Sequence, residues 1–281
     1  MKFNERFSGY GYVCAHRGAR SIAPENTLLA LEEAQRCGAD LWESDVQFTA
    51  DKQLVIFHDD TLERTTDVAE RPEYVDRKPW FVADFTLKEL QGLDAGRWFL
   101  DADPYGTIAA NEVSEEDVKL ICSQRIVTLE EVLRYCCQHD FPFNLEIKDQ
   151  QDRLSPEVVA AAVIEQLEVT GMEDLTLVSS FNHDYLRQIK KINPVIETAA
   201  LVEGAHPDDM IDYLKKLQVA AYHPDWHMTD TGLIRQLNDE GIRVNLWTVN
   251  DMETAREFIA AGATFICTDW PQKLVKEIHS A

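Results

Sequence analysis

The chain has 281 residues, of which 45% are hydrophobic, and this length suits either two ordinary domains or one α/β barrel. Its 50 acidic and 27 basic residues give a formal net charge of -23. Such a charge disfavours binding to nucleic acid or to an anionic membrane, because both partners need a basic surface. The sequence contains no run of about 18 apolar residues, and its N-terminal segment lacks the apolar stretch of a signal peptide. We therefore expect a cytoplasmic protein with no stable membrane association, and its composition leaves the oligomeric state open.

The first elements are a strand, a loop and a helix. The apolar residues 12–15 predict a strand that ends at His16 and Arg17. Asn26 stands where a helix N-cap belongs, and Gly38 stands where that helix should end.

The second strand, at residues 41–46, carries two acids. Side chains two positions apart share one face of a strand, so Glu43 and Asp45 should project together. On these residues alone two interpretations are open, half of a divalent-metal site or a pair of merely solvated acids.

A hairpin is expected after this strand. The apolar residues 54–57 follow a turn and predict its second arm. Pairing Val46 with Val55 would set Glu43 opposite His58, which brings a base next to the acids. The alternative is a histidine that only ends a strand.

A long, charged and irregular stretch follows at residues 61–125. It contains one expected short helix at residues 86–93 and a turn at residues 101–106. A connection of this length is unusual inside a compact domain. We take it as an insertion between the second strand and its helix, which is predicted at residues 128–139.

The rest of the chain alternates regularly between strands and helices. Strands are predicted at residues 143–148, 176–179, 197–202, 219–223, 243–249 and 264–268, and helices at residues 156–170, 184–192, 207–216, 230–240, 252–261 and 272–279. With the hairpin arm set aside, eight strands remain, each followed by a helix. This pattern predicts one (β/α)8 TIM barrel over residues 1–281, with a hairpin and a small insertion between strand 2 and helix 2. A doubly wound open sheet is the competing fold, but no GxGxxG motif follows the first strand.

The third strand places three hydrophilic side chains, Asn144, Glu146 and Lys148, on one face. Charged groups inside a barrel need partners, because an unpaired buried charge loses its hydration. Together with Glu43 and Asp45, Glu146 would supply an all-oxygen ligand set that suits one divalent cation, Mg²⁺ or Ca²⁺, with Mn²⁺ as a further alternative. A structural ion pair between Glu146 and Lys148 is the other interpretation.

The catalytic candidates are His16 and His58, which fall at the same end of the barrel as the acids. Two imidazoles can divide general-acid and general-base work near neutral pH. Arg17 and Lys148 would supply the local positive charge with which an acidic protein holds a phosphate. Of the other histidines, only His223 also stands at a strand end.

Several sequence blocks resemble the glycerophosphodiester phosphodiesterase family. They are HRGARSIAPENT at residues 16–27, GADLWESDVQFTADKQLVIFHDDTLERTT at residues 38–66, TLEEVL from residue 128, NLEIK from residue 144, WTVN from residue 247 and TDWP from residue 268. The resemblance implies a TIM barrel with a small insertion after its second strand. It also implies metal-dependent hydrolysis of a small-molecule substrate, a glycerophosphodiester, to sn-glycerol 3-phosphate and an alcohol.

By position, the resemblance also implies roles for individual residues. His16 and His58 look like the acid/base pair, Glu43, Asp45 and Glu146 look like the metal ligands, and Arg17 and Lys148 look like the phosphate contacts. Trp247 resembles an aromatic residue that lines the pocket, although it could equally serve core packing. The chain departs from the family at the hairpin turn, where Asp51-Lys52 stands in place of the usual Asp-Gly.

Two other functions stay open. A lysophospholipase D or sphingomyelinase D type enzyme uses similar residues on lipids, but it needs an apolar or membrane-facing patch that the acidic composition disfavours. A catalytically silent barrel would have lost some of the two histidines and three acids, and all five are present.

Overall fold

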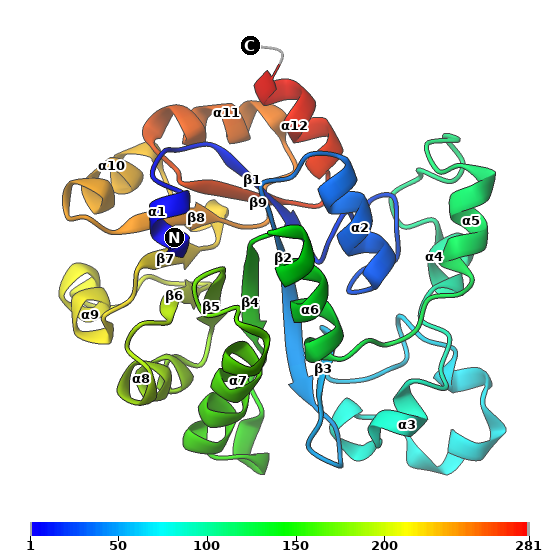
Figure 1. Ribbon diagram of the computed structural model, residues 1–281. Helices are drawn as coiled ribbons and strands as arrows, with labels where there is room; N and C mark the ends of the chain where they lie inside the picture. The colour runs from blue at the N-terminus through cyan, green and yellow to red at the C-terminus, as the bar shows by residue number, and fades with distance from the viewer. Residues whose placement is uncertain (1, 280–281) are drawn as a thin grey trace.

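The computed structural model describes residues 2–279, and it forms a closed barrel of eight parallel strands within that range (Figure 1). The strands are β1 (Tyr12–His16), β2 (Leu41–Phe48), β3 (Leu54–Ile56), β4 (Phe143–Ile147), β5 (Thr176–Ser180), β6 (Glu197–Val202), β7 (Ala221–Pro224), β8 (Arg243–Leu246) and β9 (Phe265–Thr268). They follow the order β1-β9-β8-β7-β6-β5-β4-β2, and pairing of β1 with β2 closes the barrel. Only β3 is antiparallel, as the second arm of the hairpin. The predicted (β/α)8 barrel is therefore confirmed.

Helices lie between successive parallel strands and surround the barrel (Figure 1). They are α2 (Leu28–Arg36), α6 (Leu129–His139), α7 (Pro156–Thr170), α8 (His183–Ile192), α9 (Met210–Leu217), α10 (Thr231–Asp239), α11 (Met252–Ala261) and α12 (Pro271–His279). The predicted start of α9 at residue 207 is wrong, because Asp209 has a left-handed backbone (φ 47) from which the helix cannot continue backwards. Among the described residues, no helix combines the length and the apolar character needed to cross a bilayer.

The main core lies between the strands and these helices. Trp42 and Val46 of β2 belong to it, and Trp42 stacks on Phe143 with ring centroids 4.9 Å apart. Because side chains alternate along β2, Glu43 and Asp45 face the barrel interior. The short helix α1 (Phe3–Arg6) helps to close the N-terminal end of the barrel, where Phe3 packs with the inner side chains of the strands.

The hairpin has a different register from the predicted one. Val46 pairs with Ile56 rather than with Val55, so the backbone N–H of Phe57 donates to the carbonyl oxygen of Asp45. His58 therefore lies beyond the paired arm and not opposite Glu43. The uniformly apolar arm gives no alternation from which this register could be read.

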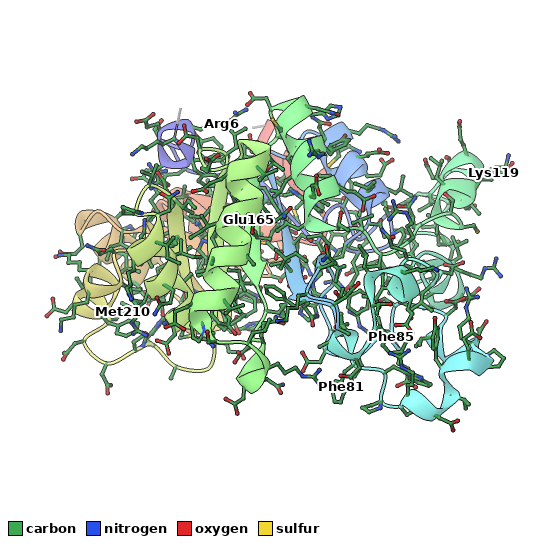
Figure 2. All side chains as sticks on the ribbon, turned by 60° about the horizontal axis from the view of Figure 1, so that its bottom comes forward. Arg6, Phe81, Phe85, Lys119, Glu165 and Met210 are labelled. Atoms are coloured by element: carbon green, nitrogen blue, oxygen red, sulfur yellow. The ribbon has the colours of Figure 1, made fainter. Side chains whose placement is uncertain are left out.

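Residues 61–125 are more ordered than the sequence indicates. They carry α3 (Leu87–Leu90), α4 (Arg97–Ala102) and α5 (Glu115–Ile121), together with three short 3-10 helices. The expected helix at residues 86–93 is only α3, and neither α4 nor α5 was predicted. Phe85 belongs to a small apolar cluster that consists mostly of residues from this segment. Figure 2 shows Phe81 and Phe85 well separated from Met210 of α9, which lies at the left of that view.

Candidate active site

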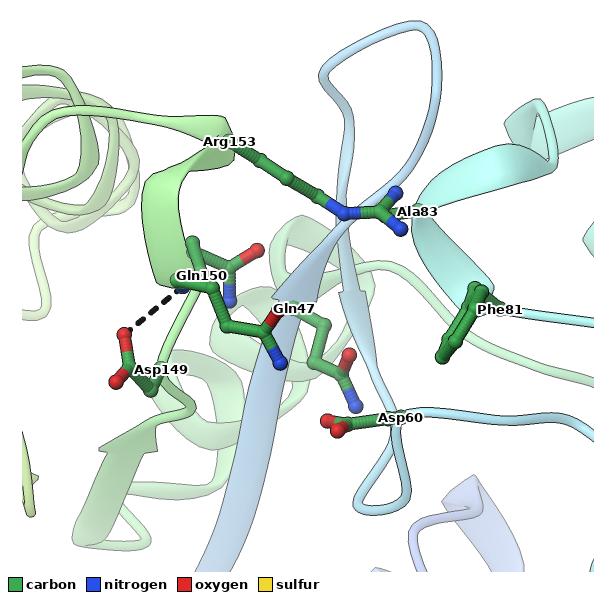
Figure 3. Close-up of a pocket in the computed structure, with 8 residues that line it drawn as sticks. Gln47, Asp60, Phe81, Ala83, Asp149, Gln150 and Arg153 are labelled. Atoms are coloured by element: carbon green, nitrogen blue, oxygen red, sulfur yellow. Dashed lines mark hydrogen bonds between the residues drawn. The ribbon is translucent and has the colours of Figure 1, made fainter.

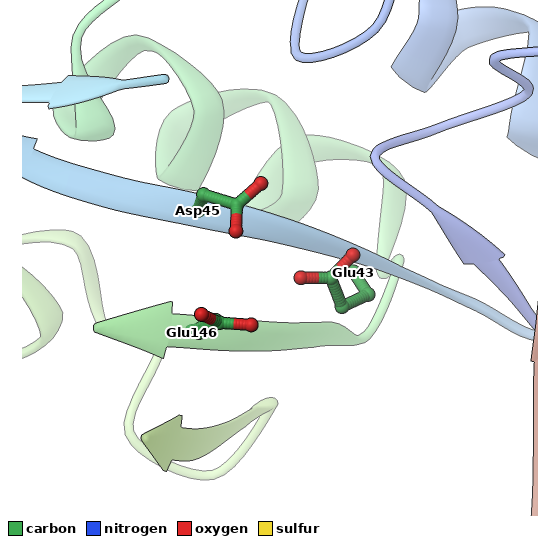
Figure 4. Close-up of side chains that lie close together, drawn as sticks. All are labelled: Glu43, Asp45 and Glu146. Carbon is green, nitrogen blue, oxygen red and sulfur yellow. The ribbon is translucent and has the colours of Figure 1, made fainter. Parts of the chain in front are cut away.

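Three buried carboxylates meet between the middle of β2 and the C-terminal end of β4 (Figure 4). Asp45 and Glu146 are direct neighbours in the parallel register, and Glu43 precedes Asp45 by two residues on the same strand face. One oxygen of each carboxylate lies within 4.8 Å of the others. Such an all-oxygen set fits a hard divalent cation, since three buried negative charges repel one another when no cation separates them.

The protonation of these acids reflects this crowding. Burial raises the pKa of Glu43 well above its usual value, and the charges of Asp45 and Glu146 add to the effect. Burial and Asp45 also raise the pKa of Glu146. Burial opposes ionisation of Asp45 as well, but the neighbouring His58, Arg17 and Lys148 hold its pKa below its usual range. The site therefore favours either a bound cation or a retained proton.

His16, at the end of β1, is oriented by an aspartate from the other end of the chain. Its Nδ1 lies 2.6 Å from Oδ1 of Asp269, while its Nε2 lies 4.0 Å from Oε2 of Glu43. Burial and the charge of Arg17 lower the pKa of His16 to about 4, although Asp269 opposes them. Burial would raise the pKa of Asp269, but the hydrogen bond with His16 lowers it to about 2. An ionised Asp269 accepts a hydrogen bond from Nδ1–H of His16, which leaves Nε2 of the neutral ring as an acceptor.

His58 has a matching partner in the next residue. Its Nδ1 lies 2.6 Å from Oδ1 of Asp59. Nε of Arg64 donates to Oδ2 of Asp59 (2.6 Å), and Nη2 donates to Oδ1 (2.9 Å). Both candidate histidines thus have Nδ1 fixed by a carboxylate, an arrangement that sets the tautomer and the orientation of the ring.

Gln47 holds the backbone that carries His58. Its Nε2 donates to the carbonyl oxygens of Phe57 (3.0 Å), His58 (3.1 Å) and Asp59 (2.7 Å). Gln47 is buried and follows Asp45 on the inward face of β2. The position of His58 is therefore fixed by a strand residue as well as by the hairpin turn.

The unusual hairpin turn keeps a glycine-like conformation. Lys52 has φ 60, in the left-handed region that favours glycine. The carboxylate of Asp51 accepts from the Thr49 hydroxyl (2.6 Å) and from the backbone N–H of Leu87 (2.9 Å). These contacts join the turn to α3.

The two predicted cations reach the carboxylate cluster. Nζ of Lys148 lies 2.8 Å from Oε1 of Glu146 and 3.7 Å from Oδ1 of Asp45. The backbone N–H of Arg17 donates to Oε2 of Glu43 (3.1 Å), and its Nε lies 3.4 Å from Oδ2 of Asp45. Both charges are therefore present where an anionic substrate would meet the carboxylates.

Asn26 is not the helix cap that we expected. Thr27 caps α2 by accepting from the backbone N–H of Ala30. Asn26 instead has φ 59, donates from Nδ2 to Oδ2 of Asp45 (3.0 Å) and accepts at Oδ1 from the Ser44 hydroxyl (2.5 Å). Asparagine and threonine are both common N-cap residues. Because Asn26 is hydrogen-bonded to the buried Asp45, Thr27 is the residue that caps the helix.

A small cavity lies inside the barrel below these groups. Its lining includes His16, Glu43, Glu146, His223 and Trp247. Nε1 of Trp247 donates to the carbonyl oxygen of His223 (2.9 Å). Oδ1 of Asn144, in the same lining, is buried without a hydrogen-bond partner among the described residues. Such an acceptor suits an ordered water or ligand group.

A second hollow of about 110 Å³ opens farther along β2 (Figure 3). It lies between the loop after β4 and residues of the insertion, and it is lined by Gln47, Asp60, Phe81, Ala83, Asp149, Gln150, Gln151 and Arg153. Its lining includes Gln47, the residue that also holds the backbone of residues 57–59. Two of its lining residues follow site residues closely in the sequence: Gln47 stands two positions after Asp45, and Asp149 directly follows Lys148.

The structure thus brings together the predicted site residues, and Trp247 lines the same cavity as His16, Glu43 and Glu146. Sequence reasoning missed the residues that hold them in place: Glu25, Asn26, Gln47, Asp59, Arg64 and Asp269. All six stand inside the sequence blocks quoted above, but contacts such as that of Asp269 with His16 join residues that are distant in the chain.

Comparisons with known proteins agree with this geometry. The family model described as "Glycerophosphoryl diester phosphodiesterase family" matches residues 16–273. A glycerophosphodiester phosphodiesterase of Caldanaerobacter subterraneus is 32% identical over 267 residues, which cover 95% of this chain and 97% of the relative. One of Bacillus altitudinis is 33% identical over 270 residues, covering 94% and 96%.

A solved structure is also similar along its whole length. It is an Oleispira antarctica phosphodiesterase in complex with the product sn-glycerol-3-phosphate, with a TM-score of 0.81, 30% identity, and coverage of 98% of this chain and 99% of that one. From the family model and these relatives, the chain belongs to the glycerophosphoryl diester phosphodiesterase family.

Proposed function

We propose that this protein hydrolyses glycerophosphodiesters to sn-glycerol 3-phosphate and an alcohol, using one divalent cation and two histidines. The observation that carries the proposal is the pairing of His16 with Asp269 and of His58 with Asp59 beside one carboxylate cluster. The product bound to the Oleispira antarctica phosphodiesterase supports the substrate class.

Glu43, Asp45 and Glu146 would hold the cation, which we propose to be Mg²⁺ or Ca²⁺, with Mn²⁺ as an alternative. When bound, it would neutralise charge on the non-bridging phosphate oxygens. Asn26 orients Asp45 for this role, because its amide fixes Oδ2 of the carboxylate, while Oδ1 lies on the side of Lys148, 3.7 Å from Nζ.

The remaining residues bind the phosphate and move protons. Arg17 and Lys148 bind phosphate oxygens at the mouth of the barrel. His16 is kept neutral by burial, so its Nε2 accepts the proton of the attacking hydroxyl, which comes from water or from the glycerol 2-position. His58 is more open to solvent, with 29% of its side chain exposed, and protonates the departing alkoxide.

The test is the release of sn-glycerol 3-phosphate from glycerophosphocholine, followed with a coupled dehydrogenase. We expect activity that is lost in excess EDTA and restored by a divalent cation, and a loss of about 100-fold or more in His16→Ala and His58→Ala. Lysophosphatidylcholine assayed in parallel separates the lipid-directed alternative.

His227→Ala is the matched control, because His227 pairs with Asp225 (2.7 Å) in the same way but has 69% of its side chain exposed. It should keep wild-type turnover. Full activity in excess EDTA would contradict the metal requirement, and wild-type turnover in His58→Ala would contradict its acid role.

A further inference from the structure

Glu25 is a buried carboxylate that three arginines surround. Only 3% of its side chain is exposed. Nη1 of Arg17 donates to Oε1 (2.8 Å), and Nη2 of Arg20 donates to Oε2 (2.5 Å). Arg64 donates from Nη2 to Oε1 (2.7 Å) and from Nη1 to Oε2 (3.0 Å). Both oxygens of Glu25 are therefore occupied by charged donors, the strongest class of hydrogen bond in proteins.

Two of these arginines also reach the carboxylates that orient the histidines. Nη1 of Arg20 lies 3.6 Å from Oδ1 of Asp269, the partner of His16. Arg64 makes two hydrogen bonds with Asp59, the partner of His58. One continuous series of polar contacts follows: His16, Asp269, Arg20, Glu25, Arg64, Asp59 and His58.

The members of this series come from separate parts of the fold. Arg20 and Glu25 lie in the loop between β1 and α2, and Asp269 follows β9. Arg64 comes from the start of residues 61–125 and lies over the ring of Trp98, 5.9 Å from its centroid. Three acids and three arginines take part when Arg17 is included, so the network is balanced in charge. Among the described residues, Nε of Arg17 and Nε of Arg20 have no hydrogen-bond partner. The remaining contacts still form a charge-balanced network, and such a network restricts the geometry of its members.

We propose that Glu25 is a positioning residue that fixes the two histidines relative to each other, through Arg20 on one side and Arg64 on the other. The inference rests on the proposed two-histidine hydrolysis. Proton transfer requires both imidazoles to be aimed at the same substrate, and small misplacements of such groups lower turnover more than binding. Residues 61–125 then contribute to catalysis through Arg64 and do more than cover the barrel.

Arg64→Ala is the main test, because 42% of this side chain is exposed and its removal leaves Glu25 paired with Arg17 and Arg20. On glycerophosphocholine we expect kcat to fall about 10-fold or more, with KM close to the wild-type value. Guanidinium added at low concentration should restore part of kcat. The control is Arg97→Ala, in the same segment with 67% of its side chain exposed, which should keep its kcat and not respond to guanidinium.

A second substrate connects Arg64 to His58. Glycerophosphodiesters with a p-nitrophenol leaving group need less protonation of that group than glycerophosphocholine does. If Arg64 acts through His58, Arg64→Ala should change the ratio of the two rates in the same direction as His58→Ala. Glu25→Gln should also lower kcat at unchanged KM, and Arg64→Ala carries the test if that buried variant does not fold.

The results separate this inference from the proposed function. A wild-type protein that releases no sn-glycerol 3-phosphate contradicts the function itself. An active wild type with an unchanged kcat in Arg64→Ala, or a loss of thermal stability alone, means that the network only anchors the segment and overturns the inference. A loss of kcat that guanidinium does not restore, or a rate ratio unlike that of His58→Ala, overturns it as well.

Discussion

His16 and Asp269 are 253 residues apart in the sequence, yet Nδ1 of the histidine lies 2.6 Å from a carboxylate oxygen of the aspartate. Closure of the barrel produces this contact, because β9 pairs with β1. His16 is the last residue of β1, and Asp269 directly follows β9. The contact fixes the ring so that Nε2 faces the carboxylate cluster, 4.0 Å from Oε2 of Glu43.

Asp269→Asn should lower kcat about 10- to 100-fold with a KM near the wild-type value. The substitution keeps the shape of the side chain but removes the charge that holds the Nδ1 proton of His16. Steady-state kinetics on glycerophosphocholine measure the effect. Asp225→Asn breaks the equivalent contact with His227 outside the site and should change neither constant. Equal kinetics in the two variants would contradict an orienting role for Asp269.

Glu43→Gln should raise the melting temperature measured in EDTA while abolishing the further rise that a divalent cation produces. At neutral pH the raised pKa of Glu43 means that its ionised form is destabilising when the site holds no cation, and the amide removes that repulsion. Thermal denaturation with and without Mg²⁺, Ca²⁺ and Mn²⁺ measures both effects. A variant that is less stable in EDTA, or that still responds to the cation as the wild type does, would count against this cluster as the metal site.

Gln47→Ala should reduce both stability and turnover. The variant leaves three carbonyl oxygens of residues 57–59 without their side-chain donor, at a cost of about 1–3 kcal/mol in the free energy of unfolding. The loosened backbone should also lower kcat, since it carries His58. Gln53→Ala, in the exposed part of the same hairpin, serves as the control for urea denaturation and kinetics. A Gln47→Ala variant that is destabilised but keeps the wild-type kcat would show that the hydrogen bonds from Gln47 do not position His58.

His223 should make the protein less stable in acid. Burial lowers its pKa to about 3 from the ordinary 6.5, so between these values the unfolded chain binds a proton that the folded protein does not. The free energy of unfolding should then fall as the pH decreases from about 6.5 towards 3, by at most about 1.4 kcal/mol per pH unit from this residue. Urea denaturation at several pH values should show a smaller slope for His223→Gln. An identical slope in the two proteins would mean that His223 is not buried as the neutral form.

The sequence predicted the barrel well because its main signals are local and repeated. Each apolar strand and each amphipathic helix after residue 128 could be read from its own residues. The polar residues Glu43, Asp45, Glu146 and Lys148 could be placed by strand alternation alone. The hairpin register could not, since a uniformly apolar arm allows a shift by one residue.

The rest of the site depends on contacts that no local pattern contains. Asp269 and Arg64 matter because barrel closure and the insertion bring them to His16 and Asp59. Asn26 has the residue type of a helix cap, and only its proximity to Asp45 shows another role. For helix α5 the sequence does contain a local signal, the capping box from Ser114 to Asp117.

The most direct test of the account is a crystal structure of the protein with Mn²⁺ and sn-glycerol 3-phosphate, using anomalous scattering to locate the metal. We predict one anomalous peak bound by oxygens of Glu43, Asp45 and Glu146, with the phosphate in contact with Arg17 or Lys148. Nε2 of His16 and of His58 should both lie within hydrogen-bonding reach of the phosphate oxygens or of a bound water. A metal bound by other residues, or a phosphate remote from both histidines, would contradict the account.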